Sequence, residues 1–256
     1  MNTSLTTAVV SASLLAAVWI GIWLRRLLPP PHLSADTKDT VKLTMGLVAT
    51  MSALLLGLLV NSGKASYDTK RGQVIQMASK VALLDRVLVL GVYGPEGAEV
   101  RRQLRTLVEE QMRRMWPGEP SVPAQLKSPS QTGDAFYAAI QTLAARDDTQ
   151  RALKAQAVSL TVEFAQLRSL MLAQSSTSIA IPVLVMVVCW LLVIFLGFTL
   201  IAPPNATANL ALMVSALCAA AAIFLIMELD RPFGGLIQIS SEPMRNALSQ
   251  LGKWGL

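Results

Sequence analysis

Four apolar stretches, each about as long as a membrane-spanning helix, constrain this sequence more than any other feature. They cover residues 5–24, 41–60, 179–201 and 210–227. A helix needs roughly 20 mainly apolar residues to cross the hydrocarbon core of a bilayer. Hydrophobic residues make up 53% of the 256 residues and charged residues only 15%, which is too apolar for an ordinary soluble domain. We therefore predict a multi-pass protein with four transmembrane helices that contact the lipid bilayer.

The region between the second and third apolar stretches is polar but has helical periodicity. Apolar residues recur there at spacings of three and four, which favours amphipathic helices that pack on one another or on copies of themselves. The rows are Val74, Met77, Val81, Leu84 and Leu88; Val100, Leu104, Leu107 and Met112; and Leu153, Leu160, Phe164, Leu167 and Met171. We find no strand pattern, so the predicted fold class is all-α.

The predicted organisation has a soluble domain inserted between two pairs of membrane helices. Residues 1–60 supply the first two transmembrane helices, residues 61–178 a helical cytoplasmic domain, and residues 179–256 the last two helices with a C-terminal cytoplasmic segment. Positive charges are more frequent beside the predicted cytoplasmic ends, in agreement with the positive-inside tendency. Arg25 and Arg26, which follow an uncharged N-terminal segment, argue for the opposite orientation.

One face of the second apolar stretch carries small residues at helical spacing. These candidate residues are Gly46, Thr50, Ala53, Gly57 and Asn61. Small side chains let membrane helices approach closely, and they also leave room for water or ions along a pore. The neighbouring face is rich in leucine and methionine and is expected to pack. Close packing and pore lining both remain open for the small-residue face.

Basic residues follow where this stretch is expected to leave the membrane. Lys64, Lys70 and Arg71 form a candidate basic mouth that would concentrate anions. Anchoring in the lipid headgroups explains the same residues equally well.

The last apolar stretch ends in a charged motif, MELDRPFGG, at residues 227–235. The candidate structural motif is Asp230, Arg231, Pro232, Phe233 and Gly234. Proline disfavours helical geometry in the residue before it, so the span is expected to end here. Ser241 is a candidate N-cap for a further short helix. Simple helix termination at the membrane interface and a functional gate are both compatible with this motif.

The sequence offers little for catalysis, metals or nucleic acids. His32 is the only histidine, and Cys189 and Cys218 lie within apolar stretches. No phosphate-binding loop, nucleophile motif or metal-ligand spacing is present. We therefore predict no enzymatic activity, no cofactor and no metal site. Basic residues are not interleaved with aromatic ones, so nucleic acid is not an expected partner.

Two segments resemble a bacterial family of membrane proteins labelled bestrophin-like. They are LLLGLLVNSGKASYDTKRGQV at residues 54–74 and ELDRPFGGLIQISSEPMRNAL at residues 228–248. In that family one signature follows the second span and the other follows the last span. True bestrophins are oligomeric anion channels with four spans, a pore-lining second span and a Pro-Phe-Gly element after the last span. Pro232, Phe233 and Gly234 match that element in kind and position.

The resemblance implies a homo-oligomer in the bacterial inner membrane with small anions as permeating solutes. In calcium-gated bestrophins an acidic cluster follows the Pro-Phe-Gly element, whereas here the next carboxylate is Glu242. A calcium site needs several oxygen ligands, so calcium gating is not expected. The alternative is a non-conducting membrane scaffold or sensor that binds partners through its cytoplasmic helices.

Overall fold

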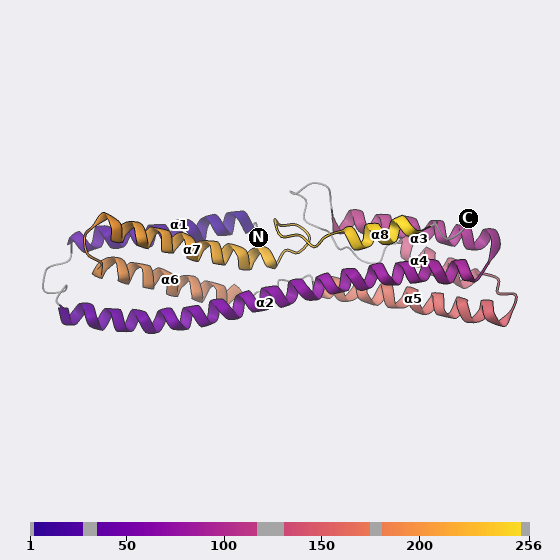
Figure 1. The fold of residues 1–256 in the computed structure, drawn as a ribbon, viewed down its shortest axis with the longest axis horizontal. Coiled ribbons are helices and arrows are strands. Elements are labelled where there is room, and N and C mark those ends of the chain that lie inside the picture. Colours follow the sequence, from indigo (N-terminus) through magenta and orange to yellow (C-terminus); the bar gives the residue numbers. More distant parts are fainter. Residues whose placement is uncertain (1–2, 28–34, 117–130, 175–180, 252–256) are drawn as a thin grey trace. The chain divides into compact units, whose positions relative to one another are not determined.

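A computed structural model of the chain describes residues 3–27, 35–116, 131–174 and 181–251. All regular structure in these ranges is helical, which confirms the all-α prediction. The helices are α1 (Thr3–Leu27), α2 (Ala35–Leu90), α3 (Gly94–Met115), α4 (Gln131–Thr142), α5 (Asp148–Ala173), α6 (Ile181–Ile201), α7 (Ala206–Leu229) and α8 (Glu242–Gln250). They divide between two compact units (Figure 1).

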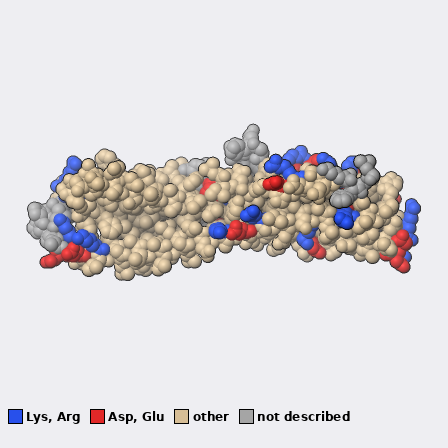
Figure 2. All heavy atoms as spheres, in the orientation of Figure 1, with Lys and Arg blue, Asp and Glu red and all other residues tan. Residues whose placement is uncertain are grey.

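Unit 1 contains the helices that are apolar enough to cross a membrane. It comprises Met1–Ser66 and Ser178–Asp230, and its described helices are α1, the first part of α2, α6 and α7. Each of these four helices has the length and hydropathy of a transmembrane span, as predicted. The charged side chains of α1 and α7 lie near the helix ends, and the face drawn in Figure 2 has a broad uncharged surface over this unit.

Helices α6 and α7 of unit 1 both pack against α1. At Gly21 a Cβ atom would lie only 2.7 Å from the Thr199 Cβ, so the glycine permits the close approach of α1 to α6. At the end of α1, Nη1 of Arg25 donates a hydrogen bond to the Ala202 carbonyl oxygen at 2.9 Å. Arg25 is therefore engaged with the α6–α7 turn, which satisfies a backbone acceptor there.

Helix α2 is much longer than the predicted span. It continues without a break through Asn61, Ser62 and Gly63 to Leu90. Gly63 packs beside Leu229 of α7, with 3.5 Å between a Cβ built on the glycine and the Leu229 Cβ. The residues beyond Tyr67 then have an apolar row of their own, which belongs to the core of unit 2. Helical structure is thus supported on both sides of the polar stretch.

Unit 2 is a helical domain with a continuous apolar core. It comprises Tyr67–Thr177 and Arg231–Leu256. The predicted row of Val74, Met77, Val81, Leu84 and Leu88 is buried in this core, together with apolar residues of α3, α4, α5 and α8. These residues are buried within one chain, so intrachain packing is the correct interpretation of that row. The turn between α2 and α3 falls at Gly91–Tyr93.

A buried ion pair joins α2 to α3 inside unit 2. The Asp85 side chain is only 2% exposed, and its two carboxylate oxygens accept hydrogen bonds from the Arg101 guanidinium at 2.7 and 3.3 Å. A buried carboxylate is costly to desolvate unless its charge is paired and hydrogen-bonded. The two hydrogen bonds from Arg101 therefore offset the cost of burying the Asp85 carboxylate between α2 and α3.

A second ion pair lies at the edge of unit 2. Glu110 pairs with Arg114 one turn further along α3. A hydrogen bond from Thr132 and the positive charge of Arg114 hold the pKa of Glu110 below its usual value of 4.5, against the opposing effect of burial. The folded protein therefore binds a proton at Glu110 less readily than the unfolded chain does.

The Glu110→Gln variant is expected to lose part of the acid sensitivity of the wild type. The ionised carboxylate stabilises the fold above the unfolded pKa, and this contribution disappears as pH falls through the lower folded pKa. Glutamine has no charge to lose. The test is the Tm of both proteins between about pH 5 and pH 3. Identical slopes of Tm against pH would contradict the role given to Glu110.

Candidate functional site

The small-residue face of α2 lies in unit 1 and is not covered by the rest of the described chain. Thr50, Ala53, Gly57 and Asn61 are exposed, and Gly46 is half-buried. A Cβ atom built on Gly46 or Gly57 would meet no described atom within 4 Å. Among the described residues, none packs closely against Gly46 or Gly57.

The polar groups of this face are few. The Thr50 hydroxyl donates a hydrogen bond to the Leu47 carbonyl oxygen at 2.8 Å, so its proton is used within the helix. Asn61 presents the one side-chain amide of the candidate face. The small and mostly apolar side chains of this face therefore offer few groups that could bind an ion.

A second exposed face of α2 adjoins the first. Leu47, Met51, Leu54 and Leu58 are exposed, and Leu54 reaches 75%. The opposite side of the helix is the packed one, where Ser52, Leu59 and Gly63 are buried. The predicted packing of the leucine-rich face therefore does not occur within the chain. Helix α2 presents two adjacent faces, one small and one bulky, to its surroundings.

The three candidate residues of the basic mouth do not share one environment. Lys64 and Arg71 are exposed and lie seven residues apart, which places them on the same side of α2. They extend the row of Gly57 and Asn61 in register. Lys70 is only 7% exposed and has its own interactions within the chain. Only Lys64 and Arg71 are therefore open to solutes.

The motif after α7 folds into a closed loop. Helix α7 ends at Leu229, with Asp230 as its C-cap residue. The Gly234 amide donates to the Arg231 carbonyl oxygen at 3.3 Å, and the Ile239 amide donates to the Pro232 carbonyl oxygen at 2.7 Å. The second bond joins the two ends of the segment 232–239. This segment is called the PFG loop below.

Two aromatic residues hold the PFG loop against the core of unit 2. The Phe233 ring lies edge-on to the Trp116 ring, with 5.7 Å between centroids and 81° between planes. Trp116 Nε1 donates a hydrogen bond to the Ile239 carbonyl oxygen at 2.7 Å, and the Tyr67 hydroxyl donates to the Gln238 carbonyl oxygen at 3.3 Å. Phe233 and Ile239 are both buried in the core. The loop is thus bound to the end of α3 by Trp116 and to the middle of α2 by Tyr67.

Sequence reasoning did not identify Trp116 and Tyr67 as partners of this loop. Trp116 is the C-cap residue of α3, far from the loop in sequence. The cap of α8 differs from the prediction, which assigned the capping side chain to Ser241. The Glu242 amide instead donates a hydrogen bond to the Ser240 hydroxyl oxygen. Ser241 occupies the N-cap position, but its hydroxyl accepts hydrogen bonds from Arg245. These two differences in hydrogen bonding leave the start of α8 at Glu242.

A Trp116→Phe variant is expected to loosen the PFG loop without emptying the core. Phenylalanine keeps an aromatic ring near Phe233 but has no N–H group for the Ile239 carbonyl oxygen. Loss of one such bond, with its acceptor left partly buried, costs about 1–2 kcal/mol. Hydrogen exchange at the Ile239 amide should accelerate, while amides in the middle of α5 keep their protection. Unchanged exchange at Ile239 would contradict this account.

No group of three or more histidine, cysteine, aspartate or glutamate residues that could hold a metal ion occurs in the described parts of the chain. The described structure offers a long apolar helix with two open faces and a loop that packs on the core of unit 2. A family model, the Bestrophin-like domain, matches residues 12–244. The chain belongs to the bestrophin-like family.

Solved structures with the same fold support this family assignment. The bestrophin-like chain is similar to a bacterial bestrophin homologue from Klebsiella pneumoniae that carries a leucine-to-threonine mutation, with a TM-score of 0.65 and 12% identity over 99% of both chains. The same homologue with an isoleucine-to-threonine mutation gives a TM-score of 0.64 and 12% identity over 100% of this chain and 99% of that one. No curated protein matches the sequence. At this identity the likeness establishes the fold, and the resemblance seen in the two sequence segments is confirmed.

Proposed function

We propose that this protein is a homo-oligomeric, anion-permeable channel of the bestrophin type in a bacterial inner membrane. Bestrophins are anion channels, and this chain has their fold and their family domain. In this proposal residues 61–178 and the C-terminal segment are cytoplasmic. The solutes are small inorganic anions that cross passively, with no cofactor.

The observation that carries the proposal is the pair of open faces on α2. One helix cannot enclose a conduit, so a pore lined by α2 requires several copies around an axis. The small-residue face, from Gly46 to Asn61, then points to the axis. The leucine-rich face beside it packs on the next copy, where dispersion contacts between well-fitted side chains favour association in lipid. Two adjacent faces with different side-chain sizes fit these two positions.

The charges beyond this face suit anions. Lys64 and Arg71 continue the same side of α2 and are exposed, so a ring of copies would repeat them around the axis. Repeated positive charge raises the local concentration of anions at an entrance. The PFG loop has a mechanical role in this mechanism, because it attaches the end of the last span to the helices of unit 2 through Trp116 and Tyr67.

The deciding experiment is ion flux in liposomes that contain the purified full-length protein. We expect chloride and bromide to cross faster than in protein-free liposomes, while potassium flux measured alongside stays at the background. Equal flux of halide and potassium would contradict anion selectivity and indicate a non-selective pore. Absence of halide flux under all tested pH values and membrane potentials would favour the second candidate.

That second candidate is a non-conducting membrane scaffold or sensor. It is favoured by a row of exposed apolar residues on the part of α2 in unit 2, namely Ile75, Leu83 and Leu90, which could bind a partner helix. Cysteine substitution separates the two functions. Water-soluble thiol reagents should label cysteines at positions 46, 53 and 57 if this face lines water. These positions should stay unlabelled in a packed or lipid-covered interface.

A further inference from the structure

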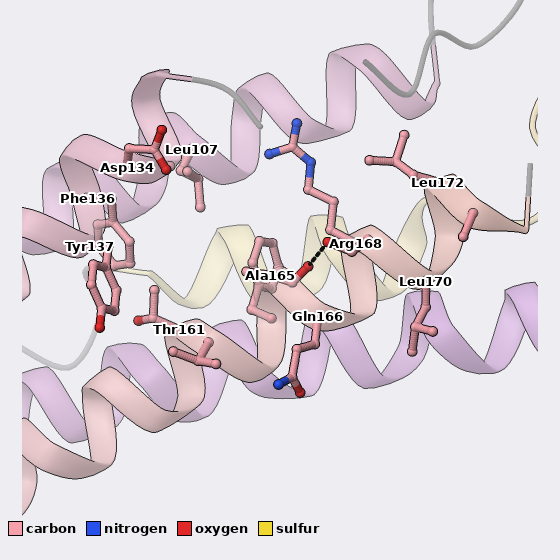
Figure 3. Close-up of a pocket in the computed structure, with 15 residues that line it drawn as sticks. Leu107, Asp134, Phe136, Tyr137, Thr161, Ala165, Gln166, Arg168, Leu170 and Leu172 are labelled. Atoms are coloured by element: carbon pink, nitrogen blue, oxygen red, sulfur yellow. Dashed lines mark hydrogen bonds between the residues drawn. The ribbon is translucent and has the colours of Figure 1, made fainter. Parts of the chain in front are cut away.

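The surface of unit 2 has apolar places that the channel function does not use. One is a groove between α4 and α5, whose walls include Phe136 and Tyr137 (Figure 3). Charged side chains of both signs, Asp134 and Arg168, also line this groove. Another is the tip of the PFG loop, where the chain carries no charge throughout residues 232–241. The loop tip is therefore the better match to a purely apolar partner.

The tip of the PFG loop presents large apolar side chains. Leu236 is 84% exposed, and no large apolar residue in the described ranges is more exposed. Ile237 beside it is exposed as well. Phe233 and Ile239, in contrast, are buried in the core of unit 2 and hold the base of the loop. Exposure of leucine to water has no stabilising effect, whereas its transfer into lipid is favourable.

The chain connects this tip to the end of an apolar span by a short path. Helix α7, the last of the four candidate spans, ends at Leu229. Leu236 follows Leu229 by seven residues, which reach at most about 25 Å even when fully extended. The headgroup layer on one side of a bilayer is roughly 5–8 Å thick. Lipid is therefore within reach of the loop tip.

A second path, along α2, limits the distance further. Gly63 of α2 packs beside Leu229, so the two residues mark the same level at the end of the spans. Tyr67 follows Gly63 by four residues of continuous helix, a rise of about 6 Å. The Tyr67 hydroxyl donates a hydrogen bond to the Gln238 carbonyl oxygen at 3.3 Å, two residues after Leu236. The loop is thus attached to α2 at about the depth of the lipid headgroups.

We propose that the tip of the PFG loop, Leu236 with Ile237, inserts into the interfacial layer of the lipid bilayer beside the last span. The partner is the phospholipid surface, at the boundary between headgroups and acyl chains, and the favourable term is burial of apolar side chains. Because Phe233 and Ile239 join the base of the same loop to the core of unit 2, an inserted tip holds that core against the membrane. The proposal rests on insertion of the four spans in a bilayer and not on conduction, so it goes beyond the channel function.

The test is electron paramagnetic resonance of a spin label on the full-length protein in nanodiscs of phosphatidylcholine and phosphatidylglycerol. The label is attached to Leu236→Cys in a protein whose own cysteines are replaced, Cys189→Ala and Cys218→Ala. Oxygen concentrates in lipid, whereas a nickel chelate stays in water. We expect the label at position 236 to collide frequently with oxygen and rarely with the chelate.

The Val92→Cys variant is the matched control. Val92 is also highly exposed and lies in the turn between α2 and α3. That turn begins only after α2 has continued for 23 residues from Tyr67 to Leu90, about 35 Å of helix. A label at position 92 should therefore collide with the chelate severalfold more often than a label at position 236.

A further pair of variants tests Leu236 with the label on its neighbour, at Ile237→Cys. Leu236→Asp should raise the collision rate of this label with the chelate severalfold, because a carboxylate is costly to place in lipid. Leu236→Met should leave the label in lipid, because methionine is also apolar. Helical content and Tm are measured for each variant, so that a misfolded protein is recognised.

Three results would overturn the proposal. The first is a label at position 236 that meets the chelate as often as the label at position 92, which would place the tip in water. The second is a low collision rate with both reagents, which would mean that protein, from the same chain or from a second copy, covers the tip. The third is a label at position 237 that stays in lipid in Leu236→Asp. Each result can be obtained whether or not the liposomes conduct halide.

Discussion

Liposomes that contain the Gly57→Leu variant are expected to show no more halide flux than protein-free liposomes, although the protein still assembles. Gly57 lies on the small-residue face of α2, where an added Cβ meets no described atom within 4 Å. A leucine therefore fits each single chain without strain. In a ring of copies, however, one leucine from every chain would project toward the same axis and close a narrow, apolar passage.

The Gly72→Leu variant is the matched control. Gly72 belongs to the same helix and also has open space around its Cβ position, but it lies in unit 2 and outside the small-residue face. The Gly72→Leu substitution adds the same side chain and changes helix propensity by the same amount as Gly57→Leu. Chemical cross-linking in the membrane should give the same oligomers for the wild type and both variants. Undiminished flux through Gly57→Leu would remove this face of α2 from the pore.

The Arg101→Met variant is expected to lose about 3–5 kcal/mol of stability in unit 2, because it leaves the Asp85 carboxylate buried without its partner. Methionine retains most of the apolar contacts of the arginine stem, so the loss reports the charge. Thermal unfolding of unit 2, monitored by hydrogen exchange at the amides of α3, measures the effect locally. A Tm close to that of the wild type would show that Asp85 does not depend on Arg101.

Two further variants test whether the loss of stability in Arg101→Met comes from the unpaired charge. Arg102→Met breaks a neighbouring pair with Glu99 in which both side chains are well exposed, and such a pair contributes roughly 0–1 kcal/mol. The double variant Asp85→Leu/Arg101→Met replaces the buried pair by two apolar side chains and should recover much of the stability. If the double variant is as unstable as Arg101→Met alone, packing at this position, rather than an uncompensated charge, determines the loss.

The sequence predicts the positions of the helices in this protein better than the tertiary contacts between them. The row from Val74 to Leu88 identifies a core helix because burial on one face repeats with the helical period. The same pattern cannot show that the helix began at Ala35, because the polar residues near Asn61 interrupt the apolar run without interrupting the backbone. Local composition is a weak guide where packing on either side supports a continuous helix.

The partners of the candidate site were less accessible to sequence reasoning. Phe233 meets Trp116, and 117 positions separate them, so no local periodicity relates them. The small-residue face of α2 is a different case, because its spacing is plain in the sequence. Spacing alone does not reveal whether the small residues pack against another helix of the same chain. The structure shows open space around the Cβ position of Gly57, so no described part of the chain packs there.

The exposed leucine-rich face of α2 has a thermodynamic consequence for the isolated chain in a membrane. Lipid tails are as apolar as leucine, so Leu47, Leu54 and Leu58 can face lipid without the penalty they would have in water. A single inserted chain would then be a stable species, and assembly of the proposed oligomer would obey mass action within the plane of the bilayer. The fraction of assembled protein should fall as lipid is added at constant protein, whereas dilution of the same vesicles with buffer should leave it unchanged.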